Sequence, residues 1–182
     1  MTAINWGNHY SYKPVTSFTL ARGRNELYVR FFVHGNCLRA VNSTDQSPVE
    51  EDSCVGLVLQ NPASGLLYDF AFNCIGICCA YSKDDDGKQL LEKDMLNRIR
   101  RFSDLLPRPF CEMEGMFHWQ LVVAIPFSLI GVSAEAVPSS LFGNFYKRAD
   151  RTALPHYLSW KEIRSEDRDF AHPEYLGVLE LE

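Results

Sequence analysis

Apolar and polar residues alternate along much of this chain, a pattern typical of β-strands that bury one face. The alternation is clearest over residues 26–34, where every odd position from Leu27 to Val33 is apolar and every even position carries a ring or a cation. Residues 15–21 alternate as well, and turn residues at 22–25 separate the two segments. We therefore predict a β-hairpin over residues 15–34.

Further strands are expected where apolar segments lie between clusters of turn residues. They cover residues 37–41, 54–60, 66–81 with a bend at Gly76, 116–126, 143–150, 155–160 and 176–181. Residues 90–102 predict the one convincing helix, because apolar residues from Leu91 to Phe102 recur at helical spacing. Residues 82–88 are polar and are expected to form a solvated tip.

Short strands with a single helix leave no room for the helical connections that a parallel sheet needs. The pattern predicts an all-β fold, an antiparallel β-sandwich of the immunoglobulin or jelly-roll type with one short helix. A chain of 182 residues without an internal repeat or a low-complexity linker fits one domain, residues 1–182.

Composition narrows the classes of partner. The formal net charge is -5, and nucleic-acid binding needs an excess of Lys and Arg, so nucleic acid is not expected as a partner. No apolar run reaches about 18 residues, so membrane insertion is not expected. The N-terminus shows no signal peptide. Met1 as the natural start predicts a cytoplasmic protein, whereas a removed leader would place it in the periplasm or outside the cell.

Cysteines and carboxylates give no clear catalytic or metal pattern. The six cysteines lack paired Cys-x2-Cys spacing, and Cys74, Cys78 and Cys79 lie in an apolar run, so we expect buried free thiols. Glycoside hydrolysis uses two carboxylates about 5–10 Å apart. The candidates, residues 50–52 and the pair Glu112 and Glu114, are neighbours in sequence and are better explained as solvated loop positions or ligand contacts. No catalytic residue is predicted.

Residues 143–160 mix rings with amides and cations to an unusual degree for core strands. Sugars are held by flat ring faces against their C–H surface and by donors and acceptors at their hydroxyls. Tyr157 and Ser159 share one face of the predicted strand, whereas Trp160 shares the other face with Leu158. This segment is the best candidate for a sugar-binding site.

Several segments together resemble the carbohydrate-binding family 9-like domains, which are common in gut Bacteroidetes and related to modules attached to xylanases. The segments follow the family order over nearly the whole chain: residues 28–31, 39–42, 47–55, 70–76, 144–147, 155–160 and 173–177. The resemblance implies a β-sandwich, a carbohydrate partner held between two aromatic rings, and structural calcium in some members. It implies no required cofactor, and no metal ligand is assigned.

By position, the resemblance matches Trp160 to an aromatic ring of the clamp and places Asn73 in a segment that supplies polar contacts. The proposed ligand-binding set is completed from the residues themselves: Trp160, Tyr157, Asn73, Asp52, Lys147 and Asn144. Where the family usually reads Trp-Glu-Asp-Ser-Cys-Val-Glu, this chain has Glu50 at the first position and Gly56 at the last.

The leading hypothesis is a non-catalytic module that binds an oligo- or polysaccharide of the xylan or glucan type in carbohydrate catabolism. One alternative is a glycoside hydrolase resembling an endo-xylanase. Another is a structural or interaction domain that has lost its ligand site. Nothing in the sequence decides the oligomeric state.

Overall fold

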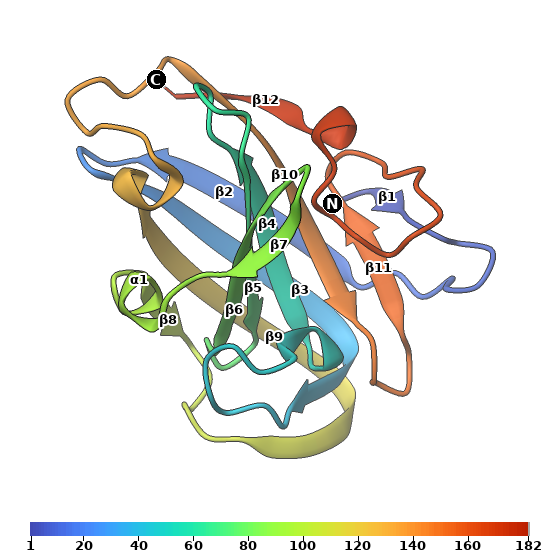
Figure 1. Cartoon of the computed structure of the whole chain (residues 1–182). Helices are drawn as coiled ribbons and strands as arrows, with labels where there is room; N and C mark the ends of the chain where they lie inside the picture. Colours follow the sequence, from blue (N-terminus) through green and yellow to red (C-terminus); the bar gives the residue numbers. More distant parts are fainter. Residues whose placement is uncertain (182) are drawn as a thin grey trace.

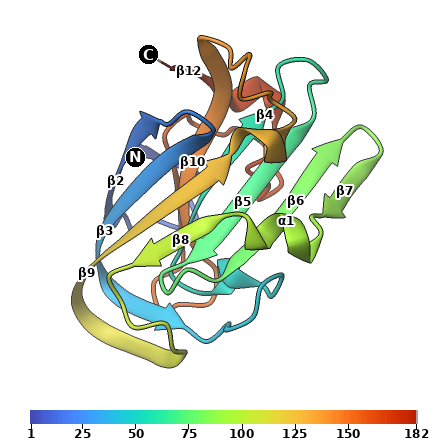
Figure 2. The same ribbon diagram turned by 90° about the vertical axis from the view of Figure 1, so that its left-hand side faces the viewer.

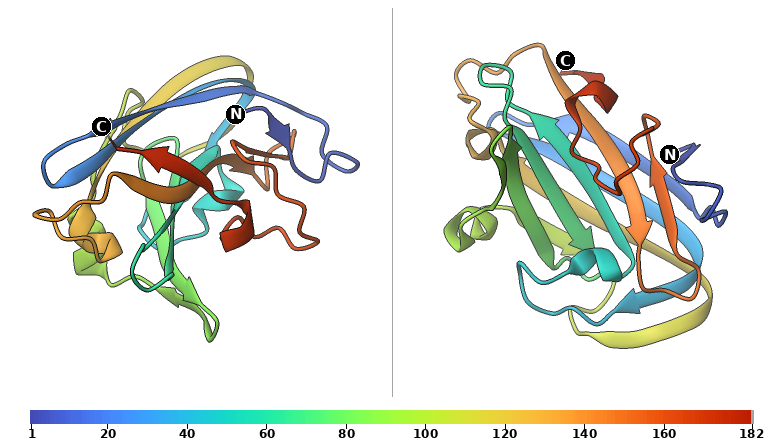
Figure 3. Two further views of the ribbon diagram at one scale, coloured as in Figure 1. Left: turned by 90° about the horizontal axis from the view of Figure 1, so that it is seen from above. Right: turned by 45° about the vertical axis from the view of Figure 1, so that its right-hand side comes forward.

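Two antiparallel sheets face each other in the computed structural model, which describes residues 1–181 (Figure 1). Seen from above in Figure 3, they form two layers, with β2, β3 and β9 in one layer and the green and orange strands in the other. The predicted all-β antiparallel sandwich is confirmed. No helix among residues 1–181 is long and apolar enough to cross a membrane.

The smaller sheet contains four strands and is seen side-on in Figure 2. In spatial order they are β2 (Val15–Arg22), β3 (Glu26–Ala40), β9 (Phe110–Pro126) and β8 (Arg100–Ser103). Strands β2 and β3 form the predicted hairpin. The prediction of a strand ending at residue 34 and a separate strand over residues 37–41 is wrong, because β3 runs through both segments. The register shifts between Gly35 and Cys37, and β3 continues to pair with β9.

The larger sheet contains eight strands. In spatial order they are β1 (Ala3–Ile4), β11 (His156–Ser159), β10 (Ser140–Ala149), β4 (Cys54–Gln60), β5 (Leu67–Asn73), β6 (Cys78–Asp84) and β7 (Gly87–Leu90), with β12 (Gly177–Glu180) also paired to β10. Strand β10 therefore lies between β4 on one side and β11 and β12 on the other.

The single strand predicted over residues 66–81 is instead the β5–β6 hairpin. Gly76 has a φ of +89°, a left-handed value that a glycine adopts without strain, so the chain reverses rather than bends there. The Asn73 side chain accepts a hydrogen bond from the Ile77 amide at 2.9 Å and closes the turn. The predicted solvated tip is a second hairpin, β6–β7.

The helix predicted over residues 90–102 is wrong in extent. Helix α1 covers only Lys93–Asn97, and residues 100–103 form β8, which pairs with β9. The apolar spacing that suggested a longer helix arises because Leu91, Leu96 and Ile99 all contact one core from consecutive short elements. Three 3-10 turns complete the fold: η1 (Val49–Glu51), η2 (Phe127–Ile130) and η3 (Pro173–Tyr175).

The chain has two hydrophobic clusters. The larger one fills the space between the sheets and includes Phe31, Phe70 and Phe145. The smaller one, which we call the outer cluster, lies on the other face of the eight-stranded sheet. The expected buried free thiols are found at Cys74 and Cys78, and Cys79 is half-buried. Burial raises the pKa of Cys74 to about 12, which suits an inert core thiol.

Candidate functional site

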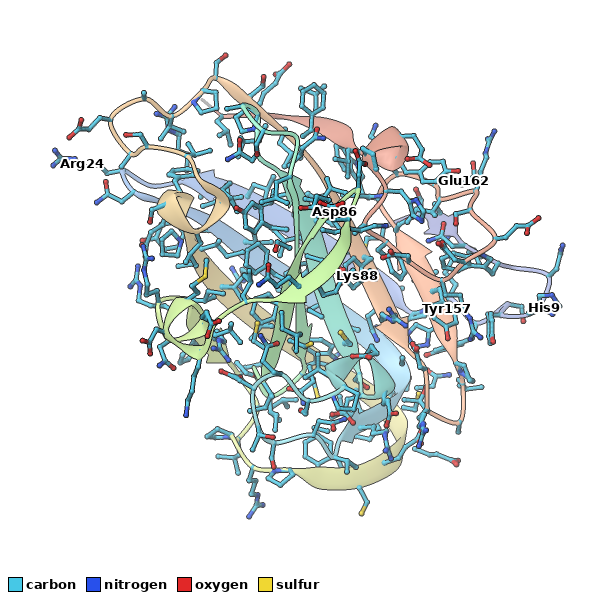
Figure 4. The ribbon with its side chains drawn as sticks, in the orientation of Figure 1. His9, Arg24, Asp86, Lys88, Tyr157 and Glu162 are labelled. Atoms are coloured by element: carbon cyan, nitrogen blue, oxygen red, sulfur yellow. The ribbon has the colours of Figure 1, made fainter. Side chains whose placement is uncertain are left out.

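The outer face of the eight-stranded sheet carries the candidate site. Because side chains alternate along strands, Phe145 points into the main core while Tyr146 and Arg148 point outward. Strand pairing places Tyr146 opposite Gly56 and Arg148 opposite Tyr157. This face looks toward the viewer in Figure 4, where Lys88 lies toward its β7 side and Tyr157 toward its β11 side.

Gly56 provides the space for the Tyr146 ring. A Cβ atom at residue 56 would lie 2.2 Å from Cζ of Tyr146, far inside contact distance. The Tyr146 hydroxyl donates to Asp69 at 2.6 Å, and Tyr81 donates to the same carboxylate at 2.7 Å. Burial raises the pKa of Asp69 to about 6, although both tyrosine hydroxyls act to lower it. The space beside residue 56 is therefore filled by a packed tyrosine ring.

Residues 161–172, together with Trp6 from the start of the chain, lie over part of this face. We call residues 161–172 the cover. Phe170 stacks on Tyr146 with ring centroids 4.2 Å apart and planes at 24°. Trp6 meets both Tyr157 and Phe170 edge-on, at 5.5 and 5.8 Å, and its indole N–H donates to the Ser165 carbonyl at 2.8 Å. In Figure 1 the cover is the red loop beside β11.

A group of rings and charges lies beside the cover, and we call it the tyrosine–arginine surface. It consists of Tyr10, Arg148, Asp150, Tyr157 and Arg168. The Arg168 guanidinium donates to the hydroxyls of Tyr10 and Tyr157 at 3.0 and 3.1 Å. Arg148 forms a two-pronged ion pair with Asp150 at 2.9 and 2.5 Å and lies 5.6 Å from the Tyr157 ring centroid.

The electrostatics of this surface keep the charges of its arginines fixed. Burial opposes the charge on Arg148, but Asp150 outweighs burial and raises the pKa of Arg148 above its usual range. Burial raises the pKa of Tyr157, and the Arg168 hydrogen bond only partly opposes this. Tyr157 is therefore a neutral hydroxyl held between two cations. The surface offers guanidinium donors, carboxylate acceptors and the half-buried Tyr10 ring.

A second charged group borders the same face near β6 and β7. Lys83 and Lys88 contact the Asp169 carboxylate at 2.8 and 3.0 Å. Burial opposes the charge on Asp169, but the two lysines and the Ala171 amide overcome it and lower its pKa to about 2. Lys88 also lies 4.4 Å from the Tyr81 ring centroid. These contacts tie the cover to the β6–β7 hairpin.

Two of the residues predicted to contact sugar, Asp52 and Asn73, are fully buried below this face. Asp52 accepts hydrogen bonds from the amides of Val41 and Asn42, both at 3.0 Å. Asn73 donates to Asp52 at 3.0 Å and to the Asn42 carbonyl at 2.8 Å. Their hydrogen bonds hold the end of β3 against η1 and the β5–β6 turn. Their role as ligand contacts remains a prediction.

Asn144 and Lys147 are also buried. The Asn144 amide donates to the Lys161 and Tyr175 carbonyls at 3.0 and 3.1 Å, so it anchors the start of the cover and the η3 turn to β10. Lys147 points to the inner side of the sheet and donates to the Arg148 carbonyl at 3.0 Å. Burial lowers the pKa of Lys147 to about 8. Neither side chain reaches the surface, and their predicted sugar contacts also remain a prediction.

Trp160 and Tyr157 lie on opposite faces of the sheet. Trp160 packs against the main core, edge-on to Phe18 and Phe145 with both centroid distances 6.0 Å. The Lys161 ammonium lies 4.4 Å from the Trp160 ring centroid. Tyr157 belongs to the outer cluster and only 1% of it is exposed. The two rings of the proposed ligand-binding set thus lie on opposite faces of the sheet, and the structure does not bring them together.

Three of the carboxylates considered for hydrolysis, Asp52, Glu51 and Glu112, already have protein partners. Asp52 is fully buried, as described above. Glu51 pairs with Arg151 at 3.1 Å, and Glu112 accepts a hydrogen bond from the Ala153 amide at 2.7 Å. Glu114 lines a hollow with the apolar side chains of Met116 and Leu154. These contacts give no acid and base facing each other, so they lend no support to the hydrolase alternative.

One group of side chains in residues 1–181 has the spacing of a metal site. Donor atoms of Asp167, Asp169 and His172 lie within 4.8 Å of one another. The group includes an imidazole, and Asp169 is already neutralised by Lys83 and Lys88. Calcium prefers six to eight oxygen ligands, so these side chains do not suit it. Structural calcium stays a prediction.

Sequence reasoning did not select Arg148, Asp150 or Arg168. The strand alternation that placed Tyr157 outward could have identified Arg148, since the two residues are directly opposite each other. Asp150 follows two residues later in the turn to β11, where it can pair locally with Arg148. Arg168 lies in the cover, an irregular segment without periodicity, and no sequence pattern connects it to Tyr10.

The chain is thus a two-sheet sandwich that carries rings and charged groups on the outer face of its larger sheet. The model of carbohydrate-binding family 9 matches residues 1–181, so the chain belongs to this family. No curated protein matches the chain.

Two solved structures are similar to this chain. A protein from Bacteroides uniformis, provisionally described as carbohydrate-binding, is 32% identical with a TM-score of 0.90, over 99% of this chain and 84% of that one. A family 9 module from Caldicellulosiruptor kristjanssonii, in complex with glucose, is 16% identical with a TM-score of 0.55, over 94% of this chain and 78% of that one. At that identity the second structure supports the fold alone.

Proposed function

We propose that this chain is a non-catalytic module that binds an oligo- or polysaccharide of the xylan or glucan type, in carbohydrate catabolism. Membership of carbohydrate-binding family 9 supports the class of ligand. The observation that carries the proposal is the tyrosine–arginine surface, in which Arg168 bridges two tyrosine hydroxyls beside the Arg148–Asp150 pair.

The chemistry of this surface fits a sugar. Guanidinium groups donate to hydroxyl oxygens, the Asp150 carboxylate accepts from hydroxyl protons, and the Tyr10 ring offers a face to C–H groups. Glu50, at the position of the family tryptophan, lies next to this surface because its carbonyl accepts from the Asp150 amide at 2.9 Å. A single ring contributes about 1 kcal/mol beyond its buried area, so binding should be weak.

The six residues proposed from sequence take different parts in this proposal. The Tyr157 hydroxyl accepts a hydrogen bond from Arg168 and so helps to hold that guanidinium in place. Asp52, Asn73, Asn144 and Lys147 are buried and would contact a ligand only after the segments packed over them had moved. For Asn144 this segment is the cover, and for Asp52 and Asn73 it includes residues 41–42. Trp160 would supply a stacking face only from the inner side of the sheet, next to Phe18.

Titration calorimetry with glucose, cellotriose and xylotriose tests the proposal. We expect Arg168→Gln to weaken binding of the preferred sugar by about tenfold, since a hydrogen bond from a charged group contributes about 1.5 kcal/mol or more. Arg164→Gln is the matched control, because Arg164 is exposed in the same segment and pairs only with Glu162. Equal affinities for the two variants would contradict the assignment of this surface.

Trp160→Ala separates the two candidate positions for the sugar. If the sugar stacks on Trp160, this variant loses binding while circular dichroism shows a folded chain. If the sugar lies on the tyrosine–arginine surface, the folded variant keeps its affinity. The two variants together therefore locate the ligand.

A structural or interaction domain is the second candidate, and one observation favours it. Tyr146 fills the space at Gly56, and Phe170 stacks over Tyr146, so part of the outer face is closed by the chain itself. Titration calorimetry against a broad panel of glycans distinguishes this candidate from sugar binding. If no glycan gives heat with a chain that unfolds cooperatively, the structural or interaction domain is favoured.

A further inference from the structure

The outer face of the four-stranded sheet, on the far side of the sandwich, carries a pair of histidines. His34 on β3 and His118 on β9 are directly opposite each other in the antiparallel register. Their neighbours Val33 and Trp119 are buried in the main core, so alternation directs both imidazoles outward. Both histidines are exposed, and their ring centroids lie 4.6 Å apart.

The imidazole nitrogens are available for a ligand. Among the hydrogen bonds and ion pairs within residues 1–181, neither ring has a partner. The neighbouring Gln120 is already engaged, because Arg30 donates to its side-chain oxygen at 2.6 and 3.1 Å. Arg30 itself lies over the Phe32 ring, 4.3 Å from the centroid, and is held away from the histidines.

The spacing of the rings matches that of two imidazoles bound to one metal ion. A metal–nitrogen bond is about 2.0–2.1 Å long, which puts each ring centroid about 3 Å from the ion. Two such rings at an angle of about 90–110° have centroids roughly 4.5–5 Å apart. The 4.6 Å between the centroids of His34 and His118 lies in this range, with planes inclined at 51°.

The surroundings leave room for an ion and its water ligands. The two histidines line a hollow of about 180 Å³ together with Val15, Ser17, Phe32 and Gln120. A two-residue set leaves the remaining coordination positions to water or to another ligand.

We propose that His34 and His118 form a surface chelate for a divalent transition metal ion of the imidazole-preferring class, with Cu(II) bound most tightly. Imidazole is the commonest metal-binding side chain, and affinity for such ligands rises along the first-row series to Cu(II). The site lies on the opposite layer from the tyrosine–arginine surface and is independent of sugar binding.

Calorimetric titration of the untagged chain with Cu(II) at pH 7.5 tests the proposal. Cys111 is exposed and could react with copper, so the titration uses Cys111→Ser as its background. We expect one ion per chain, quenching of the Trp119 fluorescence, and nitrogen splitting from two imidazoles in the electron paramagnetic resonance spectrum. His34→Gln and His118→Gln should each weaken binding on the order of 100-fold. Removing a metal ligand should cost at least as much affinity as removing a residue that only hydrogen-bonds to a ligand.

His9→Gln is the matched control, because His9 is exposed and its nearest ring partner is Tyr10 rather than another histidine. Wild-type affinity in both His34→Gln and His118→Gln, or loss of binding in His9→Gln, would overturn the proposal. Both sheet histidines are exposed, so the variants should unfold at the wild-type temperature, which differential scanning calorimetry checks.

Discussion

At the scale of single residues, Tyr146 accounts for most of what is unusual on the outer face. Its ring lies over Gly56, its hydroxyl donates to the buried Asp69, and Phe170 stacks on its other side. Burial raises the pKa of Tyr146 well above its usual range, so the hydroxyl remains a donor at all physiological pH values. The ring has no room to move away from residue 56.

Gly56→Ala should therefore destabilise the chain by about 1–3 kcal/mol, because a methyl group would overlap a ring held on all sides. Urea unfolding measures the change. Gly7→Ala is the control, since a Cβ there would lie no closer than 3.4 Å to a neighbouring side-chain atom. Equal stability of Gly56→Ala and wild type would mean that Tyr146 is free to move.

Lys147 predicts a dependence of stability on pH. Its pKa falls from the ordinary 10.5 to about 8 on folding, because burial disfavours the ammonium. Between these values the unfolded chain binds a proton that the folded chain does not, so the free energy of unfolding rises with pH. The rise from this group amounts to about 3 kcal/mol.

Lys147→Met should abolish this rise and be neutral or stabilising at pH 7. Cysteines exposed by unfolding titrate in the same range, so the difference between variant and wild type, measured by urea unfolding from pH 7 to 10.5, isolates Lys147. The exposed Lys161→Met should follow the wild-type profile. If the free energy of unfolding of Lys147→Met changed with pH in parallel with that of the wild type, the folded chain would accommodate the charge of Lys147.

At the scale of elements, the periodicity of apolar and polar residues predicted those strands that pair regularly with their neighbours in a sheet. Residues 54–60 match β4 and residues 15–21 match β2 to within one position. The failures occurred where apolar residues of several short elements meet one core. Leu91 and Ile99 repeat as a helix would, yet α1 ends at Asn97 and β8 follows. Periodicity cannot separate these cases, because burial selects apolar residues in both.

Arg101 joins the short elements that the sequence did not reveal. It forms a two-pronged ion pair with Asp45 at 2.6 and 2.8 Å and donates to the Leu96 and Gly76 carbonyls. Burial opposes the charge on Asp45, but Arg101 and the Cys78 amide lower its pKa below the usual range. This side chain connects β8 to α1, to the β5–β6 turn and to residue 45.

Arg101→Gln should cost about 2 kcal/mol in urea unfolding, because a partly buried carboxylate and two carbonyls lose their donor. The adjacent Arg100→Gln is the matched control. Arg100 pairs with Glu26 while its own side chain remains 65% exposed, and such pairs contribute little. Similar losses for the two variants would contradict the central role of Arg101.

The sequence predicted the candidate site only in part, because a local pattern does not show which residues distant segments bury. Tyr157 was placed on the correct strand face because alternation is local. The burial of Asp52, Asn73, Asn144 and Lys147 depends on segments distant in sequence, namely residues 41–42, the cover and the inner side of β3. A polar residue in a strand has the same sequence pattern whether it meets a sugar or a backbone amide.

At the scale of the whole molecule, the chain packs a sandwich and then adds a second layer of rings outside it. The outer cluster joins β4, β10 and β11 to the cover and to Trp6. Both chain ends take part in the same sheet, since β1 pairs with β11 and β12 pairs with β10 (Figure 3). The cover is thus held by hydrogen bonds at its start and by Phe170 near its end.

Phe170→Ala should destabilise the chain by about 3 kcal/mol or more, since it removes a buried ring from the outer cluster. Hydrogen exchange should accelerate in residues 161–172 and remain slow in β3 and β9. Glu166→Ala, an exposed change in the same segment, should leave both regions unchanged. Uniform acceleration over both sheets would show that the cover does not open separately.

The packing at Gly56 also constrains the order in which substitutions can accumulate. A glutamate at position 56 is incompatible with Tyr146, and a smaller residue at 146 would leave Phe170 without its stacking partner and Asp69 with Tyr81 as its remaining tyrosine donor. A substitution at one of these positions is therefore expected to be destabilising unless the others have changed first. The residues at positions 56 and 146 should therefore vary together. We expect relatives to carry either glycine at 56 with tyrosine at 146, or glutamate at 56 with a small residue at 146, and rarely a mixture.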